Sequence, residues 1–366
     1  MNNYNDMNYN GRKEEPRYEY PRYEEHFEYT TRHLEQCVQC GAQYDPRCGC
    51  QCPPQCPPGP PGPKGEQGPP GSSGVIGSNK IYAAASSSVA VIDGNTNTLL
   101  TRLDFGSGNF VEGLSVNPLT QKVYGTISVG ATGSQRRFLI IDGNTDTATQ
   151  RTISGTILGF YTGVNTLTNK IYAGANPSSF VSINGNTNLR LSTIDTGSGL
   201  VGRIVMNPST NKIYVGRGSN LTVIDANTET VLTNIAITVR GIAINPVTNK
   251  IYVISSTNMF VVDGETDTIL ATIAIDGIAN HIAVDISANK IYVTRNNDLA
   301  VLDGNTNQLL TTVVVGDNPR GIAFNEVTNK VYIGISGSVA VVDGNTNQLL
   351  TTVAVGISPS QIVIIP

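Results

Sequence analysis

The sequence contains no tryptophan, three histidines among 366 residues, and no long apolar run. So few histidines make a His-rich metal site or a haem site improbable. No stretch approaches the roughly 18 consecutive apolar residues of a membrane helix, so we expect no membrane span. The N-terminus, MNNYNDMNYNGRKEEP, lacks the apolar core of a secretory signal peptide, so we expect no such peptide here.

Charge is scarce as well, and cysteine is confined to one end of the chain. Charged residues make up 14% of the sequence and the formal net charge is −4, so we expect no basic face for nucleic acid. Residues 75–366 hold no cysteine and a single histidine, His281, which suggests no Ser/His/Asp set and no cysteine nucleophile. We therefore expect no enzyme and no cofactor. A carboxylate-based hydrolase stays open as the alternative, although nearly all aspartates fall in repeated turns.

Residues 1–58 form a polar, compositionally biased segment. They hold seven of the fifteen tyrosines together with many Arg and Glu, and aliphatic residues are nearly missing. Such a segment cannot bury enough apolar area to offset its chain entropy. We predict a disordered tail that attaches or crosslinks the protein, with tyrosines available for stacking contacts or oxidative crosslinks.

The cysteines of this tail form one cluster that ends in CGCQCPPQC. We interpret the cluster as a disulfide set that includes bonds between chains. Zinc binding is the alternative, but metal ribbons usually show two CxxC pairs around a folded spacer, and the second group here alternates and is rich in proline. The cysteines are Cys37, Cys40, Cys48, Cys50, Cys52 and Cys56.

Residues 59–74 are collagen-like, because glycine recurs at every third position through five Gly-X-Y triplets. Only glycine fits at the axis of a triple helix, and proline favours the polyproline II conformation. Five triplets are few for holding three chains together, so a stiff spacer and a trimer-forming stalk both stay open. The glycines are Gly59, Gly62, Gly65, Gly68 and Gly71.

Residues 75–366 are a repeat array whose most regular part is a Lys-[Ile/Val]-Tyr motif. The motif occurs seven times, at spacings of 42, 48, 42, 38, 40 and 40 residues. Its lysines are Lys80, Lys122, Lys170, Lys212, Lys250, Lys290 and Lys330. A period of roughly 40 residues with several short strands is typical of a β-propeller.

One unit, residues 240–275, shows four apolar runs of strand length, which we name strands a to d. The a–b turn is NPVTN and the c–d turn is DGETD, both rich in residues that tight turns prefer. Dense β-branched residues, with Gly or Asn interrupting every run, exclude helices. The prediction is therefore an all-β domain.

The unit resembles the YVTN β-propeller repeat family. The resemblance rests on Asn245-Pro246-Val247-Thr248-Asn249-Lys250-Ile251-Tyr252-Val253 and, downstream, on Val261-Val262-Asp263-Gly264. It covers about residues 77–366 and recurs with each motif. It implies a propeller fold and an extracytoplasmic or cell-surface setting, and little about activity.

The first unit begins at Ser78-Asn79-Lys80 and has no strand a. The chain ends with Ser360-Gln361-Ile362-Val363-Ile364-Ile365-Pro366, and Gln361–Ile364 matches Gly241–Ile244, the strand a of a later unit. We predict that the C-terminus supplies strand a of the first blade and closes a seven-bladed ring, which removes open sheet edges.

Six lysines of the motif are predicted to lie beside an aspartate, because the start of strand b and the end of strand c share one edge of a blade. The third unit departs, with Lys170 facing Asn184. We interpret the pairs as structural, while the aspartates are open to capping their own c–d turns instead. The pairs are Lys80–Asp93, Lys122–Asp142, Lys212–Asp225, Lys250–Asp263, Lys290–Asp303 and Lys330–Asp343.

The segment from Asp142 to Asp146, DGNTD, is similar to the start of a calcium loop. Position 6 of that loop would be Thr147 instead of glycine, and position 12 would be Ile153 instead of glutamate. We interpret the segment as a turn and expect no metal site.

The b–c loops and the d–a connections share the face whose sequence varies between units, and variable loops on a regular scaffold are where binding usually occurs. Three arginines and a histidine at the channel mouth could hold an anionic ligand such as an acidic sugar. Ordinary polar residues lining a wet channel are the alternative. At or next to the start of strand a, register places Glu112, Tyr161, Arg203, Arg240, His281, Arg320 and Gln361.

A Cys-rich tail, a short Gly-X-Y stalk and a C-terminal β domain together resemble the collagen-like proteins of the bacterial spore surface, the exosporium filament glycoproteins and their relatives. The glycines of the five triplets and the preceding cysteines carry this resemblance. It implies an N-terminal attachment to a spore layer and an outward-facing head. This chain departs from those proteins in its very short stalk and in its propeller head.

The leading functional hypothesis is a non-enzymatic surface protein whose head mediates contact or adhesion, on a spore (exosporium or coat) or on a cell surface. The expected partners are other surface or spore-layer proteins through the tail, the chain itself in a trimer or disulfide-linked multimer, and a carbohydrate or protein ligand on the variable face. A propeller enzyme or a sugar- or lactone-binding protein is the second hypothesis. A structural subunit of a surface layer or fibre is the third.

Overall fold

The computed structural model describes residues 79–366 apart from 131–134, 157, 176–177 and 198–200. The chain divides into two units, and only the second, Gly71–Pro366, contains described residues. The predicted tail, the cysteine cluster and the Gly-X-Y segment therefore lie outside the described residues.

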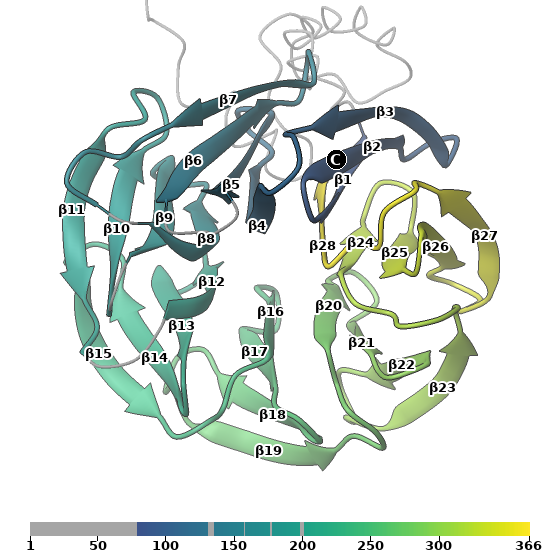
Figure 1. The fold of residues 1–366 in the computed structure, drawn as a ribbon. Helices are drawn as coiled ribbons and strands as arrows, with labels where there is room; N and C mark the ends of the chain where they lie inside the picture. The colour runs from purple at the N-terminus through teal and green to yellow at the C-terminus, as the bar shows by residue number, and fades with distance from the viewer. Residues whose placement is uncertain (1–78, 131–134, 157, 176–177, 198–200) are drawn as a thin grey trace, which may run out of the picture. The chain divides into compact units, whose positions relative to one another are not determined.

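The described chain forms seven four-stranded antiparallel sheets arranged in a ring, and no helix (Figure 1). This confirms the predicted seven-bladed β-propeller.

Among the described residues, nothing helical is long and apolar enough to span a membrane. The strands of the first four blades are β28 (Gln361–Ile365), β1 (Lys80–Ala85), β2 (Ser88–Asp93) and β3 (Thr98–Asp104); β4 (Phe110–Asn117), β5 (Lys122–Val129), β6 (Gln135–Asp142) and β7 (Thr147–Arg151); β8 (Leu158–Asn165), β9 (Lys170–Ala175), β10 (Ser179–Asn184) and β11 (Arg190–Asp195); and β12 (Val201–Asn207), β13 (Lys212–Arg217), β14 (Asn220–Asp225) and β15 (Thr230–Ile235).

The last three blades repeat the same order of strands a to d. Their strands are β16 (Gly241–Asn245), β17 (Lys250–Ile254), β18 (Asn258–Asp263) and β19 (Ile269–Ala274); β20 (His281–Asp285), β21 (Lys290–Thr294), β22 (Asp298–Asp303) and β23 (Leu309–Val314); and β24 (Ile322–Asn325), β25 (Lys330–Ile335), β26 (Ser338–Asp343) and β27 (Leu349–Ala354). Strands a lie innermost and strands d outermost, and neighbouring strands a contact one another around the whole ring (Figure 1).

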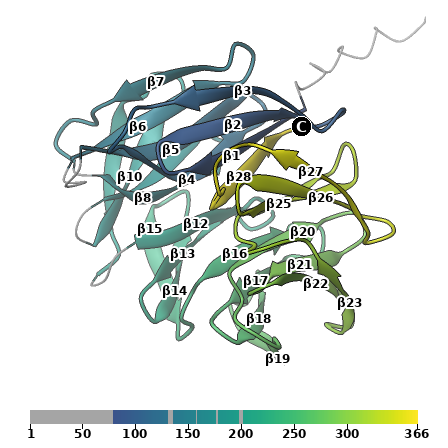
Figure 2. The same cartoon turned by 45° about the vertical axis from the view of Figure 1, so that its right-hand side comes forward.

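The ring is closed by the C-terminal strand, as the sequence predicts. β28 pairs antiparallel with β1, with Lys80 opposite Ile365 and Ala84 opposite Gln361 (Figure 2). Ile362 and Ile364 join the cluster that packs blade 7 on blade 1, and Ile365 joins the cluster between blades 1 and 2. The chain terminus is thus part of the core.

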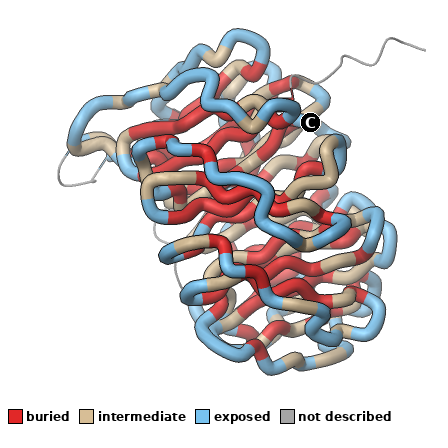
Figure 3. The backbone as a smooth tube through the Cα atoms, turned by 90° about the vertical axis from the view of Figure 1, so that its right-hand side faces the viewer, coloured by how far each residue is buried: buried red, intermediate tan, exposed pale blue. Residues whose placement is uncertain are grey.

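Burial follows the position of each strand in its blade. Strands b and c are buried almost throughout, because sheets cover both of their faces, whereas strands d expose much of their length (Figure 3). The core consists of seven apolar clusters in the described residues, each formed where neighbouring blades pack face to face. This accounts for the nearly continuous Ile, Val and Ala runs after each lysine.

A chain of asparagines fastens the blades to one another at the a–b turns. The asparagine that ends strand a donates from Nδ2 to the asparagine that precedes the lysine of the next blade, at 2.6–3.2 Å. Each acceptor asparagine has positive φ, a conformation that asparagine tolerates better than most residues. The donor and acceptor pairs are Asn117–Asn169, Asn165–Asn211, Asn207–Asn249, Asn245–Asn289 and Asn325–Asn79.

Candidate functional site at the channel entrance

The structure brings five of the seven residues predicted at the channel mouth into one cavity of about 280 Å³. They come from five different blades and meet where strands a begin. Further residues near the starts of β4 and β8 and just before β28 complete the wall: Val111, Gly113, Phe160 and Ser360. The five residues are Glu112, Tyr161, His281, Arg320 and Gln361.

The remaining two predicted residues, Arg203 and Arg240, lie beside the cavity wall. The Arg203 guanidinium lies 5.5 Å from the centroid of the Tyr161 ring, and its Nε donates to the backbone oxygen of Arg240 at 2.7 Å. Burial lowers the pKa of Arg203, and the Tyr161 hydroxyl acts weakly in the opposite direction. A guanidinium nevertheless stays charged in proteins. Arg203 is thus a partly buried cation held beside an aromatic ring.

His281 lies among positive charges. Burial, together with the charges of Arg203 and Arg320, holds the pKa of His281 well below its usual value, although a hydrogen bond to the Arg320 backbone opposes this shift. The Thr294 hydroxyl accepts from the His281 backbone N–H at 3.0 Å and donates to the Arg320 oxygen at 3.0 Å. His281 is therefore neutral at pH 7 and fixed beside Arg320.

The opposite wall of the cavity is electrically balanced. Arg136 Nε donates to Glu112 Oε2 at 3.1 Å, and the Arg136 guanidinium also lies 3.9 Å from the centroid of the Phe160 ring. Arg136 and Phe160 were not among the predicted site residues. The paired arginines of the long GTISVGATGSQRR loop were the available signal for Arg136.

Three of the inner strands carry β-bulges, two of them in the cavity-lining strands β4 and β8, which the sequence reasoning missed. Register shifts occur in β4 between Glu112 and Ser115, in β8 before Thr162, and in β12 before Ile204. Bulges re-aim side chains. Gly113, with φ +50°, is required in β4, because a Cβ there would lie 2.2 Å from the Phe160 oxygen.

The predicted Lys–Asp pairs need a correction. All six pairs lie opposite each other in the strand ladder, but each aspartate uses Oδ1 to accept two backbone N–H bonds of its own c–d turn, as Asp93 does from Asn95 at 2.8 Å and Thr96 at 2.9 Å. These bonds lower the pKa of Asp93, with the Thr96 N–H contributing most. Asn184 caps its turn in the same way.

The lysines reach the next blade instead of their own aspartate. Lys80 Nζ lies 2.7 Å from Asp146 Oδ2, and Lys212 Nζ lies 2.8 Å from Asp267 Oδ2. Their partners are the last residues of the next c–d turn, a position occupied by asparagine or glutamate in other blades. The sequence could not show this, because neighbouring blades meet only once the ring has formed. Among the described residues, hydrogen bonds to the following blade come from Lys80, Lys170, Lys212, Lys250, Lys290 and Lys330.

The motif tyrosines support the same junctions. Tyr82 donates to Asp146 Oδ1 at 2.7 Å, Tyr214 to Asp267 Oδ1 at 2.8 Å, and Tyr332 to Asn97 Oδ1 at 2.7 Å. All seven rings are completely buried between blades. The Lys-[Ile/Val]-Tyr motif is thus the device that joins consecutive blades, and its repetition needs no functional site to explain it.

The junction between blades 3 and 4 uses a different acidic residue. Glu229 stands where blades 2 and 5 have aspartate, and its carboxylate accepts from Lys170 at 2.9 Å and from Ser192. Burial acts to raise the pKa of Glu229, but the bonds from Ser192 and Lys170 outweigh it and leave that pKa below its usual range. Ser182, where other blades have Val or Ile, completes this buried group.

Replacing Asp267 tests the junction. We expect Asp267→Ala to lower the free energy of unfolding by about 3 kcal/mol, because Lys212 and Tyr214 lose a partly buried partner and alanine disfavours the φ of +58°. Asp267→Asn is the matched control, since Asn97 binds Lys330 and Tyr332 at the equivalent junction. It should cost less than about 1 kcal/mol. Chemical denaturation measures both, and equal losses would show that the acceptor oxygen is not what matters.

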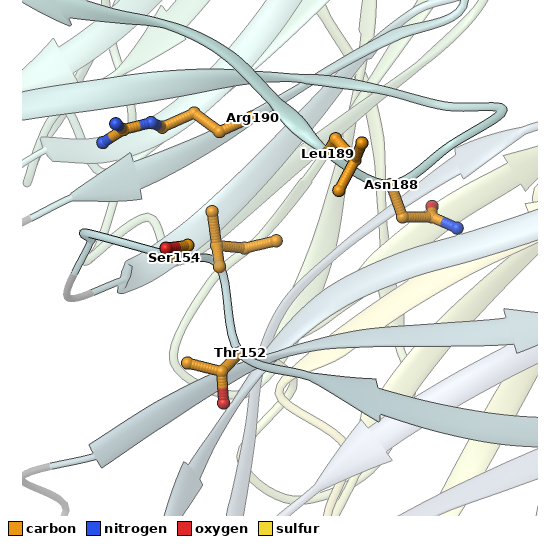
Figure 4. A pocket seen from close by; sticks show the side chains of 6 residues that line it. Thr152, Ser154, Asn188, Leu189 and Arg190 are labelled. Carbon is orange, nitrogen blue, oxygen red and sulfur yellow. The ribbon is translucent and has the colours of Figure 1, made fainter.

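A second cavity, of about 350 Å³, lies at the outer rim between the segment after β7 and the start of β11. Thr152 and Ser154 lie on one segment, and Asn188, Leu189 and Arg190 on the other (Figure 4). The Arg190 guanidinium donates to the Gly155 oxygen at 3.2 Å and to Thr156 Oγ1 at 3.1 Å. None of the predicted site residues lies here.

The suspected calcium turn is used for structure. Asp142 Oδ1 caps the turn, and both oxygens of Asp146 accept from blade 1. In the part of the chain that the structure describes, no group of three or more His, Cys, Asp or Glu could hold a metal ion.

The described residues form a seven-bladed β-propeller with a cavity of mixed charge where the innermost strands begin. No known family model matches the chain, and no curated protein matches its sequence. Among solved structures, the chain is similar to a functionally unknown protein from Desulfotomaculum acetoxidans DSM 771, with a TM-score of 0.63 and 14% identity over 78% of this chain and 99% of that chain. At this identity the likeness shows the fold alone.

Proposed function

We propose that the chain is a non-enzymatic surface protein whose propeller is a binding head. The observation that carries the proposal is how the residues are divided in the ring. The repeated lysines, tyrosines and asparagines hold the blades together, whereas residues that differ between blades gather in the cavity at the channel entrance. A rigid scaffold whose residues vary at a cavity suits recognition.

The setting of this head is proposed from the order of segments in the sequence. The cysteines precede five Gly-X-Y triplets, and the propeller follows directly. This order supports attachment through the tail, display on a short collagen-like stalk, and a place on a bacterial spore or cell surface. The YVTN-type repeat supports the same surface setting.

The solution mass of the full chain tests the attachment part of the proposal. We expect multimers that reductant dissolves, because six cysteines clustered between Cys37 and Cys56, in a segment poor in aliphatic residues, favour bonds between chains. A variant with all six cysteines changed to serine is the control and should be monomeric without reductant. Monomers of the unchanged chain under oxidising conditions would contradict crosslinking by the tail.

A further inference from the structure

We propose that the channel-entrance site binds a sugar acid, with the guanidinium groups of Arg203 and Arg320 receiving its carboxylate beside His281. This inference rests on the proposed binding function and names the ligand class for the same cavity.

The first argument is uncompensated charge. Within the described residues, Arg203, Arg240 and Arg320 make no ion pair, whereas Arg136 and Arg295 each pair with a carboxylate. Arg203 is in addition partly buried, with Nε directed to a backbone oxygen. A partly buried cation without a counter-ion is costly, and a bidentate carboxylate is the partner that a guanidinium fits best.

The second argument is the position of His281. Arg203, from β12, and Arg320, just before β24, both lie close enough to His281 to act on it electrostatically. Arg320 and His281 line the cavity, and Arg203 lies beside Tyr161, which lines it as well, so charges from blades 4 and 7 border the same cavity. Glu112, the one carboxylate in the wall, is neutralised by Arg136.

The third argument is the remaining wall, which favours a sugar acid over a bare inorganic anion. A cavity of about 280 Å³ is much larger than a sulfate ion. Tyr161 and Phe160 contribute aromatic rings, and Ser360 and Gln361 contribute neutral hydrogen-bonding groups suited to sugar hydroxyls. The paired Glu112 carboxylate offers a further acceptor for a hydroxyl.

Calorimetric titration of the full chain with D-glucuronate, D-glucose and sodium sulfate tests the assignment. We expect binding of glucuronate, none of glucose, and at least about tenfold weaker binding of sulfate. Arg203→Gln and Arg320→Gln should each weaken glucuronate binding about tenfold or more, since each removes a charge-assisted pair. Arg320 is exposed, so its replacement leaves the fold intact. Arg190→Gln, in the rim cavity, is the matched control and should change nothing.

The histidine resonances of the full chain give an independent readout. His281 faces Arg203 and Arg320, with Glu112, Tyr161 and Gln361 on the other strands around it. A bound carboxylate offsets the two positive charges, so it should raise the pKa of His281 and make glucuronate bind more tightly as the pH falls. His281→Gln identifies the signal.

Equal affinity for glucose and glucuronate, or binding unchanged in both arginine variants, would overturn the site. Sulfate binding as tight as glucuronate would overturn the assignment to a sugar acid. These failures are distinct from failure of the proposed function. Reductant-sensitive multimers without glucuronate binding would leave a surface protein with a different ligand, and glucuronate binding by a chain that never crosslinks would leave the site standing alone.

Discussion

A chain that stops at Ser360 is expected to lose the closed ring. Truncation removes β28, so β1 loses its antiparallel partner from Lys80 to Ala84. Ile362, Ile364 and Ile365 leave the core, where they are at most 9% exposed. At about 1.5–3 kcal/mol each, their burial contributes roughly 5–9 kcal/mol, which is comparable with the whole stability of an ordinary domain of about 5–15 kcal/mol.

Circular dichroism and solution mass measure this loss. A chain lacking only Pro366, which is exposed and lies outside β28, is the control and should melt like the unchanged protein. A synthetic peptide with the sequence of residues 358–366, added to the truncated chain, should restore the melting transition by strand addition. A truncated monomer that melts at the original temperature would show that closure by the C-terminus is not needed.

The ring is also expected to unfold cooperatively above about pH 11, with its tyrosines ionising in the same step. Burial raises the pKa of Tyr252 and of Tyr332 to about 12, and it raises the pKa of the other five motif tyrosines as well. Tyrosines of the unfolded chain titrate near pH 10. The folded ring therefore binds these protons more tightly, and this stability is fully present below about pH 10 and is lost as the pH rises towards 12.

The size of this alkaline effect follows from the two moderate shifts. A shift of two pKa units corresponds to about 2.7 kcal/mol. Ionisation of Tyr252 and Tyr332 alone should therefore lower the free energy of unfolding by about 5 kcal/mol by pH 12. Tyrosinate absorbance and circular dichroism, followed together during an alkaline titration, measure it. Ionisation of the motif tyrosines well before the loss of secondary structure would contradict their burial.

Tyr172→Phe is the matched variant for this titration. Among the described residues, the Tyr172 hydroxyl has no hydrogen-bond partner of good geometry, and the nearby Asn165 amide donates to Asn211. The variant should therefore be at least as stable as the unchanged protein at neutral pH. Above about pH 10 it should be the more stable of the two, because one buried ionisable group is gone.

The fold could be predicted from the sequence because the same strand and turn pattern recurs seven times along the chain. The seven Lys-[Ile/Val]-Tyr motifs give the number of blades, and the match between Gln361–Ile364 and Gly241–Ile244 gives the closure. The destination of each lysine could not be predicted, since Asp146 or Asp267 meets its lysine only across a junction between blades. Strand pairing within one blade is a local property, whereas contact between blades depends on the angle of the whole ring.

The candidate site could be predicted only as a set of positions. Register alone gave the starts of strands a, and five of those residues share the cavity. The bulges in β4, β8 and β12 carry no alternating signal, because an inserted residue such as Gly113 looks like any other glycine in a strand. Arg136, which neutralises Glu112, lies at the start of β6, beside a b–c connection whose length differs from that of every other blade.

The lysine and tyrosine hydrogen bonds point from each blade to the one that follows, which gives the ring a rotational sense. Lys330 and Tyr332 make the same kinds of bond to Gly94 and Asn97 of blade 1 that Lys212 and Tyr214 make to blade 5. The joint between blade 7 and blade 1 is therefore bonded like the joints between the other blades. A circularly permuted chain, opened at a d–a connection instead of between strands a and b of blade 1, would keep all of these bonds, so they do not depend on where in the ring the polypeptide starts.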